Sequence, residues 1–154
     1  MQHNSDIVIP DTSCLILLFK IDEPGLLKLP GRNIITTPQV AEEFKFTLPE
    51  WINIQKPPSG LYRKVSKLKL DRGETSVLAL SLSINNSIVI IDDLKGRKAA
   101  ERLNIRYSGT LGLILRAKQQ GILPKVKPIL KKIDETNFRI DKNLLITIMN
   151  EAGE

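Results

Sequence analysis

Short apolar runs rich in β-branched residues alternate along this chain with longer segments whose apolar residues recur at helical spacing. The clearest run covers residues 88–91, four β-branched residues in succession, and it predicts a short strand buried on both faces. Further strands are predicted at Ile7–Pro10, Asn33–Thr36 and residues 105–107, with a short extended piece at 51–55. Strands that alternate with helices predict an α/β fold built around a short, mainly parallel sheet.

Capping residues help to locate the helices between these strands. Thr37 precedes Pro38, a residue favoured at the first helical position. Asp71 followed by Glu74 forms a capping box, and this strong cap favours a helix although residues 77–84 alternate like a strand. The predicted helices cover residues 14–19, 38 onward, 61–70, 71–84, 96–103, 111–119, 124–136 and 141–151.

The size and composition of the chain predict one globular domain over residues 1–154, with residues 1–6 as a polar end. We find no internal repeat and no linker. Cys14 is the only cysteine, so an internal disulfide is impossible and a cytoplasmic location is expected. The longest apolar run, residues 14–19, is too short to span a bilayer and no secretory signal is visible. A membrane partner is therefore not expected.

The net charge is +6, and the pI is about 9.5. Such a balance suits a polyanionic partner, with RNA or another nucleic acid as the leading candidate, although a lysine-rich solvated surface explains the charge equally well. Cations concentrate on two predicted helices. Lys64 and Lys67 stand on the first, and Arg97 and Lys98 stand on the second. These four residues are the candidate RNA contacts.

Carboxylates stand where predicted strands end. Asp11 follows the first strand, and Asp92 and Asp93 follow residues 88–91. Parallel strands end at one edge of a sheet, where open α/β folds place their ligand sites, so these side chains are expected to converge. Each residue advances ~100° around a helix, which places Glu43 beside the apolar stripe and Glu42 towards water. Glu43 therefore faces the same cleft.

These acids, with Glu74, suit a metal site. Clustered carboxylates raise one another's pKa values unless a cation neutralises them, and Mg²⁺ prefers oxygen ligands. One or two such ions activate water for phosphodiester cleavage. Any single acid is as well explained by a helix cap or an ion pair. Thr12, Ser13 and Thr110 stand at the starts of two predicted helices, where they are predicted caps. Their hydroxyl groups could instead contribute to the site.

Taken in order, several short motifs resemble those of PIN-domain proteins, close to the VapC-like toxin group. They are Asp11-Thr12-Ser13, Pro38-x-Val40-x-x-Glu43, Leu70-Asp71-x-Gly73-Glu74, Ile91-Asp92-Asp93-x-x-Gly96-Arg97 and Gly109-Thr110-x-Gly112-x-x-x-x-Ala117-Lys118-x-x-Gly121. The resemblance covers residues 6–151. It implies a three-layer α/β/α sandwich, an Mg²⁺- or Mn²⁺-dependent ribonuclease, a homodimer and, for a toxin, a protein antitoxin.

The resemblance also implies roles for individual residues. Asp11, Glu43 and Glu74 match the first acids of the family, as catalytic residues and metal ligands. Many PIN proteins carry Thr-x-Asp at the later strand end, whereas Ile91 occupies the threonine position here. The later metal ligand is therefore Asp92 or Asp93, with Asp93 the expected catalytic residue, and the second metal position stays open.

Other readings of the same residues remain in competition. A haloacid-dehalogenase pattern requires an acid where Ser13 stands, and a receiver domain carries its acid pair near the N-terminus. Both fit poorly. The runner-up is a non-catalytic PIN-like module that binds RNA or a protein. The presence of all the proposed acids favours an enzyme over this alternative.

Overall fold

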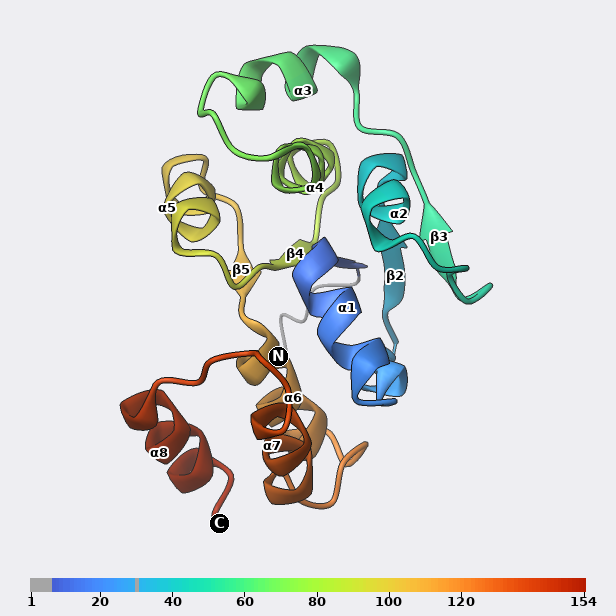
Figure 1. Cartoon of the computed structure of the whole chain (residues 1–154). Helices are drawn as coiled ribbons and strands as arrows, with labels where there is room; N and C mark the ends of the chain where they lie inside the picture. The colour runs from blue at the N-terminus through green and yellow to red at the C-terminus, as the bar shows by residue number, and fades with distance from the viewer. Residues whose placement is uncertain (1–6, 30) are drawn as a thin grey trace.

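A parallel sheet forms the centre of the computed structural model, which describes residues 7–29 and 31–154 (Figure 1). In these residues the strands lie in the order β3-β2-β1-β4-β5, and each neighbouring pair is parallel. Their bounds are β1 Ile7–Pro10, β2 Asn33–Thr36, β3 Ile52–Ile54, β4 Ser87–Ile90 and β5 Tyr107–Ser108. The predicted α/β architecture is confirmed. The expected polar end, residues 1–6, lies outside the described residues.

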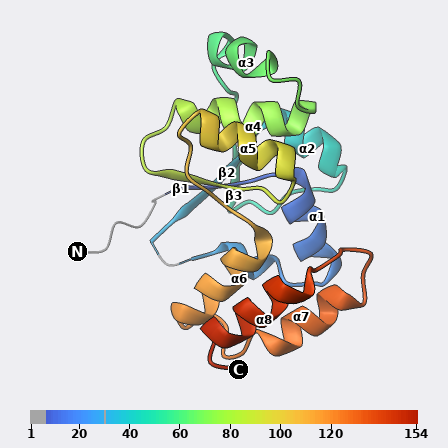
Figure 2. The same ribbon diagram turned by 90° about the vertical axis from the view of Figure 1, so that its left-hand side faces the viewer.

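Helices cover both faces of this sheet, as the side view shows (Figure 2). Helices α4 and α5 lie over one face, and α1 and α6 lie over the other, with α7 and α8 beyond α6 (Figure 2). The helices are α1 Thr12–Lys20, the 3-10 turn η1 Pro24–Leu27, α2 Pro38–Phe44, α3 Ser59–Ser66, α4 Arg72–Leu82, α5 Leu94–Arg102, α6 Thr110–Gln119, α7 Lys127–Asp134 and α8 Lys142–Glu151. Among the described residues, no helix has the length and apolar character needed to cross a bilayer.

Strand β4 is buried along its whole length, as the β-branched run at residues 88–91 predicts. Two backbone hydrogen bonds extend the sheet beyond the strand ends. Asp11 N donates to Ile90 O at 2.9 Å, and Ile91 N donates to Ser108 O at 2.8 Å. These bonds hold the residues that follow β1 and β4 at the carboxyl edge of the sheet. Cys14 is fully buried in the core, so the prediction of a small core residue is confirmed.

Several predicted boundaries and caps were wrong. Helix α3 covers Ser59–Ser66 instead of 61–70, and β5 covers Tyr107–Ser108 instead of 105–107. Helix α5 begins at Leu94 instead of Gly96, because Asp93 caps it by accepting from Gly96 N at 3.0 Å. Thr12 and Thr110 are the first residues of α1 and α6 and do not cap them; the cap positions belong to Asp11 and Gly109.

A polar clasp fixes the C-terminal helices. The side chain of Glu154 accepts hydrogen bonds from the backbone N–H groups of Val126 and Lys127, at 2.8 and 3.1 Å. Lys118 on α6 donates to the same carboxylate at 2.7 Å and also bonds the Ala152 carbonyl. The Lys118 contact and these backbone donors hold the pKa of Glu154 low, at about 2. One carboxylate thus ties α6, the start of α7 and the residues after α8 together.

Candidate active site at the carboxyl edge of the sheet

The carboxyl edge brings together acids from four separate parts of the chain. Asp11 follows β1, Glu43 lies on α2, Glu74 lies on the first turn of α4, and Asp92 and Asp93 follow β4. The charges of Glu43 and Asp92 act on the pKa of Asp11, and those of Asp93 and Asp11 act on the pKa of Glu74, which is consistent with the predicted convergence. The structure thereby gathers residues that the sequence separates by up to 82 positions, from 11 to 93.

Asp11 is the most deeply buried of these acids, with 4% of its surface exposed. Burial raises the pKa of Asp11 from 3.8 to about 7. A hydrogen bond from the Thr12 backbone N–H opposes this rise, while the charges of Asp71, Glu43 and Asp92 add to it. No cation counterbalances Asp11 among the described residues that affect its titration. The position is therefore unfavourable for a carboxylate in the protein alone.

Glu74 has a similar environment on α4. Its exposed fraction is 7%, and burial is the main cause that raises its pKa from 4.5 to about 7. The charges of Asp71, Asp93 and Asp11 raise the pKa of Glu74 further, and a hydrogen bond with the Asp71 backbone lowers it. Asp11 and Glu74, two buried carboxyl groups on different elements, thus lie in one negative region, and both have pKa values close to neutral pH.

Glu43 and Glu42 point in different directions, as the helical phase predicts. Glu43 Oε1 accepts a 2.7 Å hydrogen bond from Thr12 Oγ1 at the start of α1. Glu42 is exposed and lies 3.5 Å from Arg72 Nη1 in a surface ion pair. Gly73 leaves room for the inward acid, because a Cβ at that position would overlap Glu43 Oε1. The Thr12 hydroxyl, which the sequence left between capping and site roles, orients Glu43.

Asp92 and Asp93 have different partners although they are adjacent. Asp92 Oδ1 accepts from Thr110 N at 2.9 Å and Oδ2 accepts from Thr110 Oγ1 at 2.6 Å, so Asp92 caps α6 from another segment. Arg97 Nη2 lies 3.8 Å from Asp92 Oδ1. Asp93 is exposed and caps its own helix through Gly96 N. Both side chains thus have structural partners, whereas Asp11 has no cationic partner among the described residues.

Asp71 is the acid whose place in the site was missed. The sequence marked Asp71 as a capping residue and as part of the motif Leu70-Asp71-x-Gly73-Glu74, but not as a site residue. It does cap α4, because its Oδ1 accepts from Glu74 N at 2.7 Å. Its charge nevertheless raises the pKa of both Asp11 and Glu74. A local capping signal explained Asp71 completely, so nothing in the sequence indicated that α4 begins beside β1.

The donor set fits a hard divalent cation. All the candidate ligands are carboxylate oxygens, and burial together with neighbouring negative charges raises the pKa values of the two buried ones, Asp11 and Glu74. The side chains do not form a closed cage: within residues 7–29 and 31–154, no three Asp, Glu, His or Cys side chains lie together as a complete metal-ligand group. Mg²⁺ commonly uses one or two carboxylates and completes its shell with water and substrate phosphate, so the open arrangement is compatible with it.

The candidate RNA contacts are only partly grouped around this edge. Lys64, Lys67 and Lys98 are exposed, and Arg97 lies beside Asp92. The residues of α3 that line a hollow of about 480 Å³ include Tyr62 and Arg63 instead of Lys64 and Lys67. Helix α3 also ends earlier than predicted, so Lys67 lies at its C-cap and not on the helix.

The model of one protein family, described as PIN domain, matches residues 7–154. This match covers nearly the whole chain, and the five-stranded parallel sheet between helices is consistent with it. The chain belongs to the PIN-domain family. PIN domains are generally nucleases and typically use divalent metals. No curated protein matches the chain closely enough to narrow this assignment.

Proposed function

We propose that this protein is an Mg²⁺- or Mn²⁺-dependent ribonuclease that cleaves RNA phosphodiester bonds at the carboxyl edge of its sheet. The observation that carries the proposal is the pair of buried acids Asp11 and Glu74, whose pKa values rise to about 7 without a neutralising cation. Folding alone gains nothing from such a pair, and groups of this kind concentrate at functional sites. The basic charge of the chain suits a polyanionic substrate.

The acids have distinct parts in this proposal. Asp11 and Glu74 would hold the cation directly, and Glu43, fixed by Thr12, would complete the set from α2. Of the two later acids, Asp92 is the better candidate ligand, because Thr110 holds its side chain in place. Asp93 would contribute through its charge near Glu74. A bound cation supplies charge neutralisation and an activated water for attack on phosphorus. Exposed Lys and Arg side chains would retain the RNA strand.

Metal dependence is the direct test. Purified protein is expected to cleave single-stranded RNA with Mg²⁺ or Mn²⁺ and to stop when EDTA is added. Gel analysis of labelled RNA at matched ionic strength measures this, and excess Mn²⁺ should restore cleavage. The control is the Glu42→Gln protein, which changes an exposed acid and should cleave like the unaltered protein. Cleavage that persists undiminished in EDTA contradicts the proposal.

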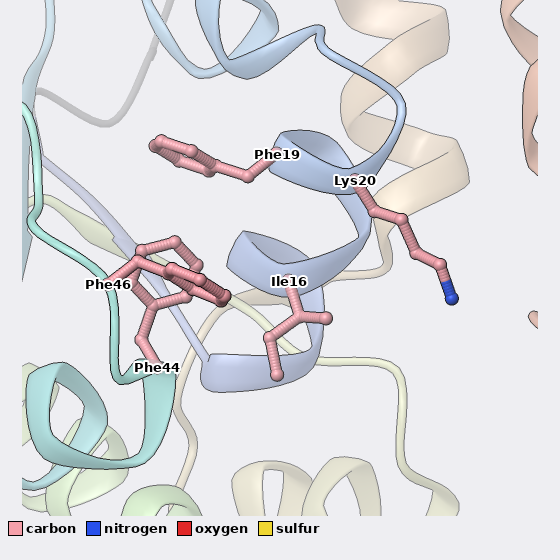
Figure 3. Close-up of a pocket in the computed structure, with 5 residues that line it drawn as sticks. All are labelled: Ile16, Phe19, Lys20, Phe44 and Phe46. Atoms are coloured by element: carbon pink, nitrogen blue, oxygen red, sulfur yellow. The ribbon is translucent and has the colours of Figure 1, made fainter.

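A second candidate function, binding to a protein partner, is favoured by an apolar pocket on α1 and α2. Ile16, Phe19, Phe44 and Phe46 line a hollow of about 560 Å³ with Lys20 at its border (Figure 3). Ile16 is 44% exposed and Phe46 is 74% exposed, although Phe46 packs edge-on against Phe44. Contiguous exposed apolar surface of this kind marks interaction sites. We propose that a second copy of the chain covers it, or an antitoxin if the protein is a toxin.

Sedimentation velocity tests this candidate with the protein alone. If the pocket holds a second copy, Phe46→Ser should shift the chain towards monomer by roughly tenfold or more in dissociation constant, because burying one large aromatic side chain is worth about 1.5–3 kcal/mol. Ile146→Ser is the matched control, since Ile146 is 57% exposed on α8. An unchanged monomer fraction in Phe46→Ser excludes the second copy as occupant.

A further inference from the structure

A further hollow adjoins the acids and has no role in the proposed chemistry so far. It measures about 370 Å³ and lies where α6 and α8 meet the carboxyl edge. Asp92 and Arg97 form its border with the acids, and its walls include Leu111, Phe138 and Leu144. Leu144 is 42% exposed, so apolar surface faces solvent inside the hollow.

Two arginines line this hollow, and their situations differ. Arg97 is fixed: its Nε donates to Ile91 O at 3.0 Å, and its guanidinium lies over the Tyr107 ring, 5.8 Å from the centroid. Arg139 is exposed, and within the described part of the chain it makes no hydrogen bond or ion pair. The two carboxylates of the lining already have donors, since Asp92 binds Thr110 and Asp141 accepts from Leu144 N at 3.2 Å. Arg139 is thus the cation available to an anionic ligand.

Gly109 keeps the hollow open at its border with the acids. A Cβ at this position would overlap the Arg97 guanidinium and would also crowd Asp92 Oδ1. The absence of a side chain therefore allows Arg97 to lie flat against the backbone before α6. These contacts explain the first two residues of the Gly109-Thr110 motif: Thr110 donates a hydrogen bond to Asp92, and Gly109 leaves space for the Arg97 guanidinium.

We propose that this hollow, the Phe138–Arg139 pocket, binds one nucleotide of the RNA strand next to the bond that is cut. This inference rests on the proposed function and names where its substrate lies. Phe138 and the neighbouring leucines contact the base, and Arg139 contacts the phosphate that leads into the acidic edge. Aromatic and arginine side chains along a strand are the usual means of holding single-stranded nucleic acid. The volume falls within the range of small-ligand sites.

RNA binding in EDTA tests the pocket without cleavage. Fluorescence anisotropy of a labelled single-stranded oligoribonucleotide should show roughly 5- to 100-fold weaker binding for Phe138→Ala, as base stacking measured by alanine substitution indicates. A loss in the same range is expected for Arg139→Ala, which removes a charge-assisted contact to phosphate. Arg106→Ala is the matched control, because Arg106 is exposed at the opposite end of β5 and its backbone contact survives the change. We expect less than a twofold change for this control.

Folding and ligand identity require two further arms. Phe138→Leu keeps an apolar side chain where Phe138 packs against the core, and it should weaken binding even if Phe138→Ala fails to fold. An oligonucleotide that lacks the base expected in the pocket should bind the unaltered protein more weakly than the complete oligonucleotide does. The Phe138→Leu protein should bind the two oligonucleotides with equal affinity. Competition by a 5′-mononucleotide that matches the whole strand in affinity would identify a free nucleotide as the ligand and overturn the assignment to RNA.

The pocket and the proposed function can fail separately. If RNA binding depends on Phe138 and Arg139 but the protein never cleaves RNA, the pocket is supported and the proposed ribonuclease activity is contradicted. Cleavage by a protein whose Phe138→Leu and Arg139→Ala variants bind like Arg106→Ala keeps the enzyme and overturns the pocket. An absence of measurable RNA binding at low salt also overturns the pocket.

Discussion

Asp11→Asn is expected to abolish RNA cleavage while making the metal-free protein more stable at pH 8. Asp11 has a raised pKa of about 7 in the folded protein, against an ordinary value of 3.8. At pH 8 its buried negative charge opposes folding, and the neutral amide removes that charge with little change in shape. Each pKa unit corresponds to about 1.4 kcal/mol, which sets an upper limit of ~4 kcal/mol, and relaxation of the site makes ~1–3 kcal/mol the expected gain.

The pH dependence follows from the direction of this shift. Between pH 3.8 and about 7 the folded protein holds a proton at Asp11 that the unfolded chain has lost. The free energy of unfolding therefore falls as the pH rises through this window, and the loss is complete above it. Glu74, whose pKa also rises to about 7, adds to the same trend. Asp11→Asn should thus gain clearly less stability at pH 5, where only part of the loss has occurred, than at pH 8.

Thermal or urea unfolding at the two pH values, each with EDTA and with Mn²⁺, measures these effects. Mn²⁺ should stabilise the unaltered protein at pH 8, because a ligand that binds only the folded state shifts the equilibrium towards it, and should leave Asp11→Asn unchanged. Cleavage should fall by more than about 100-fold, since even the outer partners of metal ligands typically matter 10- to 100-fold. Equal destabilisation of Asp11→Asn at both pH values would show that Asp11 serves the fold and not a site.

Glu43→Gln is expected to reduce cleavage at least roughly tenfold, and Glu42→Gln is expected to leave it within about twofold. Glu43 faces the acids and is oriented by Thr12 Oγ1 at 2.7 Å, so its charge contributes to cation binding. Glu42 forms only an exposed ion pair with Arg72, and such pairs contribute little. The two substitutions are chemically identical and one position apart, which makes them a matched pair.

Initial cleavage rates across a Mn²⁺ titration distinguish loss of the cation from loss of folding. Glu43→Gln should require a higher Mn²⁺ concentration for half-maximal rate, while its unfolding midpoint stays close to that of the unaltered protein, because the amide oxygen still accepts from Thr12. Similar losses for the two variants would mean that the direction in which each glutamate points does not decide its effect on cleavage. A greater loss for Glu42→Gln would place the catalytic face of α2 on its solvent side.

Several parts of the site were accessible from sequence because they follow from local geometry. The 3.6-residue period of a helix is enough to separate Glu43 from Glu42, since both lie on one short element with a clear apolar stripe. Burial of β4 on both faces followed from the β-branched run at residues 88–91. Asp71 illustrates the opposite case, because a complete local explanation as a cap concealed its electrostatic effect on Asp11.

The sequence by itself therefore determined the α/β class, most strand positions and the acids that end β1 and β4, because hydrophobic period and strand polarity are properties of neighbouring residues. Only the tertiary structure decided how Asp92 and Asp93 differ. Pairing of β4 with β5 brings Thr110 to Asp92, while Asp93 turns back to its own helix. The Phe138–Arg139 pocket likewise depends on packing of α8 against α6, a long-range contact that local patterns do not encode.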